Sequence, residues 1–168
     1  MAALTFAHVV ISLIAIGSGC VVIFGFFRDN PVDRWTALFL TTTVLTSVTG
    51  FLFPVHKFMP SHALGILSLL LLAPAILGRY RFRLNRAWRP IFVVTAVGAQ
   101  YFNVFVLVVQ FFEKVPALKA AAPTQSEPPF VITQLVVLVL FVLAGTLSVK
   151  KFHDKLLPAA SRSSLPVR

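Results

Sequence analysis

The sequence predicts an all-α fold, an integral membrane bundle of five transmembrane helices with the N-terminus outside and the C-terminus in the cytoplasm. The first observation is composition, because 58% of the 168 residues are hydrophobic, only 12% are charged, and the mean hydropathy is +0.90. Such values lie outside the range of soluble globular domains and indicate that lipid surrounds most of the chain. The second observation is a set of five long apolar runs, and the third is the placement of cations between them.

The five runs contain no Asp, Glu, Lys or Arg; they are residues 4–27, 35–55, 62–78, 90–112 and 130–149. About 20 apolar residues cross hydrocarbon as a helix, whereas a barrel strand needs only about 10 with alternating polarity. Because lipid offers no hydrogen bonds to the backbone, each run is expected to be a helix. We therefore expect one transmembrane domain over residues 1–155 and a disordered cytoplasmic tail over residues 156–168.

Local signals support each run in turn. The first has no cation before Arg28, so it lacks the basic start of a cleaved signal peptide and is expected to remain as a span. The second begins at Trp35, a residue type that favours the membrane boundary. The third is the shortest, and Pro74 is expected to kink it. The fourth begins at Pro90 and the fifth after the Pro-Pro pair at 128–129, where a missing N–H costs little.

The cations are distributed unequally between the gaps. The gap 28–34 holds two, the gap 79–89 holds five and the tail from residue 150 holds five, which together make twelve of the fifteen Lys and Arg residues. The other gaps hold only Lys57, Lys114 and Lys119. By the positive-inside rule, this bias predicts an external N-terminus. It also accounts for the basic isoelectric point of about 11.0, so nucleic acid is not expected as a partner.

Two polar segments offer surfaces for partners. The gap 79–89 interleaves cations with aromatic side chains, and a cation near an anionic headgroup contributes about 1 kcal/mol. We therefore expect five residues to contact anionic lipid headgroups on the cytoplasmic side: Arg79, Arg81, Arg83, Arg86 and Arg89. On the opposite side, the Pro-rich segment 113–129 is expected to be a stiff, non-helical loop that acts as a docking surface or a lid.

Three histidines are expected at the outer side of the bundle: His8, His56 and His62. Neutral imidazoles at one depth could ligate the iron of haem b, or a metal such as copper or zinc. The sequence contains neither Cys-x-x-Cys-His nor His-Glu-x-x-His. The alternative is that these histidines reach lipid headgroups or cap helix ends.

Small residues mark the helix faces that are expected to pack together. The face of the first run that includes His8 also carries Ser12, Ala15 and Gly19. One side of the second run carries Thr42, Thr46, Thr49 and Gly50. Small residues at this spacing let helix backbones approach closely, which places His8 toward the bundle interior.

The fourth run carries an intramembrane polar stripe, Gln100, Asn103 and Gln110. Steps of three and seven residues nearly complete whole helical turns, so the three side chains are expected to share a face. Unpaired amides are costly in lipid, and this face should therefore meet other helices or a cavity. The amides could bind a quinone, a haem propionate or a polar solute, or they could form hydrogen bonds between helices.

Three segments of the chain are distinctive: Tyr-Phe-Asn-Val-Phe-Val-Leu-Val-Val-Gln at 101–110, Lys-Val-Pro-Ala-Leu-Lys at 114–119 and Ala-Pro-Thr-Gln-Ser-Glu-Pro-Pro-Phe at 122–130. Through these segments, the last three runs resemble a family of small uncharacterised bacterial inner-membrane proteins. It implies a multi-pass protein of the bacterial inner membrane, which is the plasma membrane of the cell. No activity, cofactor or binding residue follows from the resemblance.

These observations favour a non-enzymatic protein with an accessory or interaction role. Pumps and channels normally keep a charged residue at depth in the membrane, whereas these runs hold none. No catalytic constellation is recognisable either. The expected partners are the bilayer and either another membrane protein or further copies of this chain. One alternative is a small electron-transfer subunit that binds haem or metal through His8, His56 and His62. Another is a small solute carrier that uses Gln100 and Asn103.

Overall fold

The computed structural model describes residues 2–30, 32–53 and 60–152, and these residues form helices and short connections without a strand. In chain order the helices are α1 (Ala2–Phe27), α2 (Asp33–Gly50), α3 (Pro60–Ile76), the π-helix η1 (Leu77–Arg81), α4 (Trp88–Lys114), α5 (Pro116–Ala121) and α6 (Pro128–Lys151). The predicted all-α class is confirmed for these residues. His56 and the predicted tail 156–168 lie outside them.

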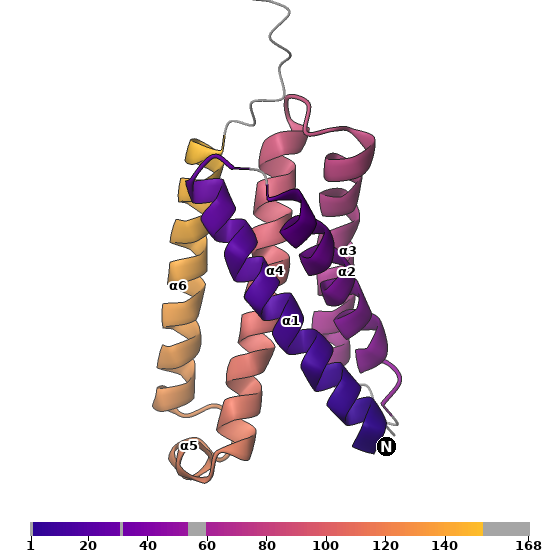
Figure 1. The fold of residues 1–168 in the computed structure, drawn as a ribbon. Helices are drawn as coiled ribbons and strands as arrows, with labels where there is room; N and C mark the ends of the chain where they lie inside the picture. The colour runs from indigo at the N-terminus through magenta and orange to yellow at the C-terminus, as the bar shows by residue number, and fades with distance from the viewer. Residues whose placement is uncertain (1, 31, 54–59, 153–168) are drawn as a thin grey trace, which may run out of the picture.

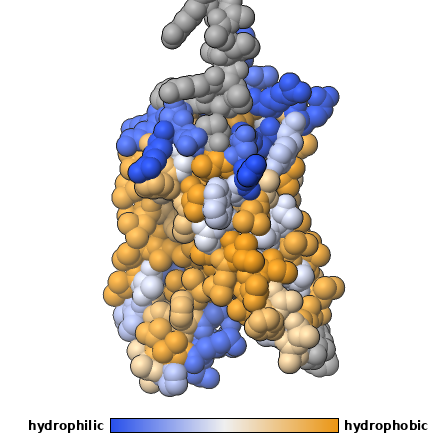
Figure 2. Space-filling view, viewed as in Figure 1, coloured by the Kyte–Doolittle hydropathy of each residue, from blue (hydrophilic) through white to orange (hydrophobic). Residues whose placement is uncertain are grey.

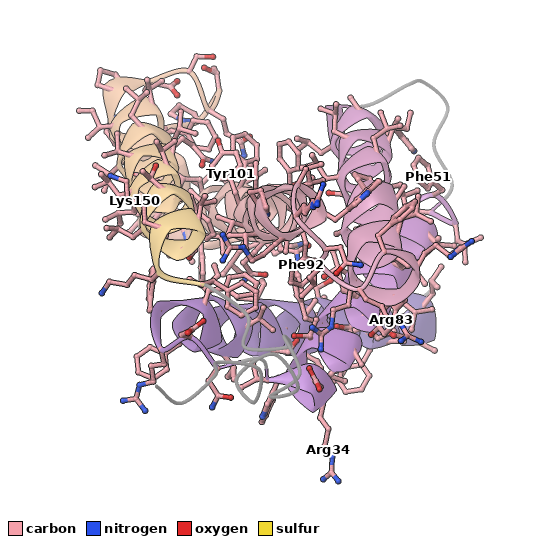
Figure 3. The ribbon with its side chains drawn as sticks, turned by 90° about the horizontal axis from the view of Figure 1, so that it is seen from above. Arg34, Phe51, Arg83, Phe92, Tyr101 and Lys150 are labelled. Atoms are coloured by element: carbon pink, nitrogen blue, oxygen red, sulfur yellow. The ribbon has the colours of Figure 1, made fainter. Side chains whose placement is uncertain are left out.

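The long helices alternate in direction along the chain (Figure 1). In this view α1, α3 and α6 run upward, and α2 and α4 run back down. From above, α4 lies between α3 and α6, with α1 and α2 along one side of it (Figure 3). α4 contacts α1, α3 and α6, so it is the central helix of the bundle.

The alternation separates the cations of the described residues into two unequal groups. The upper end holds Arg28, Arg34, Arg79, Arg81, Arg83, Arg86, Arg89, Lys150 and Lys151. The lower end holds Lys114 and Lys119. Figure 2 shows hydrophilic atoms gathered at the upper end and a hydrophobic band below them. We call the upper end the basic end.

Four helices of the described chain are long and apolar enough to cross a membrane: Ala2–Phe27, His62–Arg81, Trp88–Lys114 and Pro128–Lys151. This is the pattern of a multi-pass membrane protein. The second predicted run forms α2, but that helix has only 18 residues and carries Asp33 and Arg34 in its first turn. It is not among the four. A fifth crossing and the orientation of the bundle therefore stay predictions.

Two helix boundaries differ from the sequence prediction. The segment 113–129 is not wholly a loop, because α4 continues to Lys114 and residues Pro116–Ala121 form α5. The reason is local: Pro116 suits the first turn of a helix, and three of the next five residues are alanine, the best helix former. Pro74 lies inside α3, and the helix widens into the π-turn of η1 just after it.

The core lies toward the basic end of the bundle. Phe26 of α1 packs edge-on against Phe92 of α4, with ring centroids 5.6 Å apart, and its ring lies 5.0 Å from that of Phe152. All three side chains are buried, together with Phe39 and Leu72. In contrast, residues 101–109 in the lower half of α4 are all only half-buried. The bundle is therefore tightly packed at one end and looser at the other.

Candidate functional site

Gln100 is the most deeply buried polar side chain of α4, with 0% of its surface exposed. Its amide Nε2 donates a hydrogen bond of 2.8 Å to the backbone carbonyl oxygen of Ile16 on α1. The same nitrogen lies 3.7 Å from the Sγ atom of Cys20. Since a carbonyl in a helix already accepts one backbone hydrogen bond, this second donor ties α4 to α1 without breaking either helix.

Gly19 makes the approach of Gln100 possible. A Cβ atom at this position would lie 2.2 Å from Oε1 and 2.4 Å from Cδ of Gln100, far inside van der Waals contact. The small residues Ala15 and Gly19, which the sequence assigns to a packing face, are both buried in α1. What the sequence did not reveal is that a glutamine, rather than another backbone, fills the space over Gly19.

Asn103 extends this contact to a third helix. Its Nδ2 donates to Thr43 Oγ1 of α2 at 3.2 Å and lies 3.4 Å from Oε1 of Gln100. The amides that a solute carrier would use are thus engaged in hydrogen bonds between α4, α1 and α2. Sequence reasoning missed Thr43, which is fully buried. The signal was available, because the buried residues Thr36, Phe39, Leu40, Thr43 and Ser47 of α2 recur at helical spacing.

Gln110 does not share this environment, since it is exposed near the lower end of α4. The seven-residue step from Asn103 drifts by about 20°, and the three-residue step from Gln100 by about 60°. In addition, α1 crosses α4 obliquely and diverges from it toward the lower end (Figure 1). The polar stripe therefore consists of one buried amide, Gln100, one half-buried amide, Asn103, and one exposed amide, Gln110.

A buried amide on α6 was also missed. Gln134 is 8% exposed, and its Nε2 donates to the carbonyl oxygen of Phe105 on α4 at 3.2 Å. Within the described residues, its Oε1 is buried and has no hydrogen-bond partner. An isolated polar residue in an apolar run is the signal that points to it.

His8 lies at the lower end of α1, half-buried against α2. Its Nδ1 is 2.8 Å from Thr49 Oγ1, and that hydroxyl lies 2.7 Å from the carbonyl oxygen of Leu45, to which it donates. In the tautomer that carries a proton on Nδ1, Thr49 Oγ1 accepts from Nδ1–H, and the lone pair of the neutral imidazole lies on Nε2. The ring also meets Phe53 edge-on, with centroids 5.2 Å apart.

His62 lies in the first turns of α3 and is buried. Its ring stacks on Phe51, with centroids 5.7 Å apart and an interplanar angle of 30°. His8 and His62 thus both belong to the lower end of the bundle, and His56 falls outside the described residues. In the part of the chain that the structure describes, no three His, Cys, Asp or Glu side chains come together as a metal-binding group.

The basic end holds an open pocket of about 510 Å³ lined by Asp33, Arg34, Ala37, Arg79, Tyr80, Arg83 and Leu84. Arg79 forms an ion pair with Asp33 of α2. Arg34 points away from the bundle (Figure 3), and Arg83 is exposed in the loop after η1. The pocket therefore keeps two cations that can meet an anionic headgroup, in addition to the paired Arg79.

The loop after η1 is shaped by local contacts rather than by glycine. Arg83, Leu84 and Arg86 adopt positive φ angles of 48°, 54° and 44°. Leu84 is buried, and its N–H donates to the carbonyl oxygen of Gly78 at 2.9 Å. The ring of Phe82 stacks on that of Trp88 at 4.0 Å. These contacts hold the predicted headgroup residues of the loop, with Arg81, Arg83 and Arg86 exposed.

No protein-family model, curated protein or solved structure matches this chain.

Proposed function

We propose that this protein is a non-enzymatic accessory protein of the bacterial inner membrane that acts by binding a partner membrane protein along α6. The observation that carries the proposal is the poor packing of α6. It is the most apolar of the four candidate spans, with a mean hydropathy of 2.6 over its most apolar 18 residues. Yet only 6% of that stretch is buried, against 39% of the corresponding stretch of α4. Its buried side chains are Gln134 and Ser148.

The exposed residues of α6 form a continuous surface. Val136, Val139, Leu140, Leu143 and Leu147 are each between 46% and 58% exposed. They follow helical spacing and face away from α4, and we call them the outer face of α6. Helices in lipid associate by van der Waals packing along such faces. A partner helix on this face would cover the side of α6 that its contacts with α4 and α1 leave exposed.

The lower end supports the proposal, because it offers an ordered surface next to α6. Gln125 Nε2 lies 3.4 Å from the carbonyl oxygen of Val109, so the connection after α5 is held against α4. Glu127 accepts hydrogen bonds from Thr124 and Ser126 just before α6 begins. A connection organised in this way loses little conformational entropy when it binds a partner.

Photocrosslinking in native membranes tests the proposal. A photoreactive residue at Leu143, on the outer face of α6, is expected to give one protein adduct of defined mass. The same residue at Leu70, which is 63% exposed on α3, is the matched control and is expected to react with lipid alone. Substituting Leu147→Trp should abolish the Leu143 adduct, whereas Leu67→Trp on α3 should not. Lipid adducts alone at Leu143 would show that α6 simply faces the bilayer.

A haem or metal site is the second candidate, and the geometry of His8 favours it. Metal-ligating histidines commonly hold one ring N–H on a protein oxygen and bind the metal through the other nitrogen. His8 has this arrangement in the tautomer whose Nδ1–H donates to Thr49 Oγ1, 2.8 Å away. The purified protein would then show a Soret band or stoichiometric copper that disappears in His8→Ala or His62→Ala. A colourless, metal-free protein rules this candidate out.

A further inference from the structure

A groove of about 450 Å³ runs between α4 and α6 in the half of the bundle nearer the basic end. It is lined by Val94, Val97, Gly98, Tyr101, Leu138, Phe141, Val142, Gly145, Thr146, Val149 and Lys150. In Figure 3, Tyr101 lies between the two helices and Lys150 lies on α6. Most groove residues of α6 lie on the side that faces α4, whereas Thr146 and Lys150 are exposed and lie at the rim, where the groove borders the outer face of α6.

The lining is apolar along its length and charged at one end. Tyr101 and Phe141, with ring centroids 5.8 Å apart, lie at the deep end. The hydroxyl of Thr146 donates to the carbonyl oxygen of Val142 at 2.7 Å, so it places no polar demand on an occupant. Lys150 is the one charged residue of the lining, and it lies at the basic end. The groove thus suits a molecule with an apolar chain and an anionic head.

The length of the groove identifies the occupant more closely. From Leu138 to Lys150 the helix rises by about 18 Å at 1.5 Å per residue. One leaflet contributes about half of the roughly 30 Å hydrocarbon core, so the groove spans about one leaflet. A partner helix would need a groove across the whole core. An acyl chain anchored at the headgroup level needs only one leaflet.

We propose that this groove binds one acyl chain of an anionic phospholipid, whose phosphate pairs with the ammonium group of Lys150. The arginines of the loop after η1 attract anionic headgroups in general, because they act through charge alone. The groove adds a fitted surface for the chain, and this converts general attraction into binding of a single lipid. The lipid would fill the groove that lies beside the contacts between α4 and α6.

Native mass spectrometry of the detergent-purified protein tests this site with two lipids that have the same acyl chains. Phosphatidylglycerol is expected to bind as a single molecule, about fivefold more tightly than phosphatidylcholine, from the ~1 kcal/mol that one Lys contributes. Lys150→Gln should remove this preference. Lys114→Gln, at the opposite end of the bundle, is the matched control and should preserve it.

A second pair of variants tests the apolar part of the groove. A Cβ atom at Gly145 would meet Val97 at an ordinary 3.5 Å, so Gly145→Leu can be accommodated while its side chain fills the groove. It should lower the affinity for both lipids at least tenfold. The same substitution at Gly17, where a Cβ atom meets nothing within 4 Å, should have no effect. Thr146→Phe, at the exposed rim, provides a second obstruction if Gly145→Leu fails to fold.

The results that would overturn the site are specific. Equal affinity for the two lipids would remove the role of Lys150. Unchanged binding of phosphatidylglycerol in both Gly145→Leu and Thr146→Phe would place the lipid elsewhere, on the arginines of the basic end. Neither result would bear on the proposed partner contact, which is read from adducts at Leu143.

Discussion

α4 and α6 are alike as sequences and different as structural elements. They have 27 and 24 residues, both are apolar enough to cross a membrane, and each carries one buried glutamine inside its apolar run. Yet α4 contacts α1, α2, α3 and α6, while α6 leaves most of its surface uncovered. Hydropathy therefore determines that a helix enters the membrane, and it says little about which neighbours the helix acquires there.

The two glutamines explain part of the difference. Gln100 fits against Gly19, with its amide bonded to α1 and in contact with Asn103, whereas Gln134 has only its Nε2 bond and a buried Oε1 without a partner in the described residues. One amide is fully integrated into the packing of the bundle. The other is half satisfied, although it also bonds to a neighbouring helix. The small residue opposite Gln100 is what allows its amide to be buried completely.

α4 also differs along its own length. Its upper half is largely buried, while residues 101–109 are all half-buried. The lower end of the molecule is divided by a hollow, and hydrophilic atoms lie within this hollow (Figure 2). Because α1 crosses α4 obliquely, it covers the upper half of α4 and leaves the lower half open (Figure 1).

The largest effect is expected at the contact between Gly19 and Gln100. Gly19→Val should lower the free energy of unfolding by about 1–3 kcal/mol, because the new side chain overlaps the buried amide. Gly17→Val on the exposed face of the same helix is the control. Unfolding by denaturing detergent in bicelles measures the difference. If the double variant Gly19→Val with Gln100→Ala recovers no stability, the contact is not the cause of the loss.

A smaller effect should separate the two amides. Gln100→Leu removes the bond to the carbonyl oxygen of Ile16 and should cost about 0.6–1.7 kcal/mol, the range of such bonds in membranes. Gln134→Leu should be close to neutral, because it also removes a buried oxygen without a partner. The same unfolding measurement compares them. Equal losses from the two variants would contradict the distinction drawn between α4 and α6.

The smallest effect concerns the start of α6. Desolvation acts to raise the pKa of the Glu127 carboxyl, but hydrogen bonds from the Thr124 side chain, and then from the backbone N–H groups of Thr124 and Ser126, outweigh it and hold the pKa below its ordinary value. A depressed pKa stabilises the fold above the ordinary Glu pKa of about 4.3, and this contribution is lost as the pH falls through the lower folded value.

Hydrogen exchange measures this contribution at the first turn of α6. The protection factor of the Val131 amide, which bonds to the carbonyl oxygen of Glu127, should fall as the medium becomes acidic, after the intrinsic slowing of exchange in acid has been divided out. In Glu127→Gln the protection factor should already be lower at neutral pH and should lack the acid-dependent fall. Glu113→Gln, at an exposed position outside this turn, is the control. An acid response that survives in Glu127→Gln would assign it to another group.

Much of the fold could be predicted from the sequence, because apolar runs without charge have one stable conformation in lipid. The bounds predicted for the first, fourth and fifth runs match those of α1, α4 and α6 within a few residues. The prediction erred where local chemistry outweighs hydropathy. Residues Pro116–Ala121 form a helix through proline and alanine, and α2 ends at Gly50, five residues before the predicted end. For the candidate site, Gln100 and Asn103 could be selected as costly amides, but their pairing with Gly19 and Thr43 could not be predicted, because it depends on how the helices cross.

By itself, the sequence determined that this chain is helical, that its long helices suit a membrane and that its cations gather in alternate gaps, because these properties depend on composition and order along the chain. Only the tertiary structure decided which amides are satisfied, which helix remains uncovered and where a groove opens. Those outcomes depend on the angle at which α1 crosses α4 and on the atoms that meet there, such as Gly19 beneath Gln100. The difference between α4 and α6 is therefore a property of packing rather than of hydropathy.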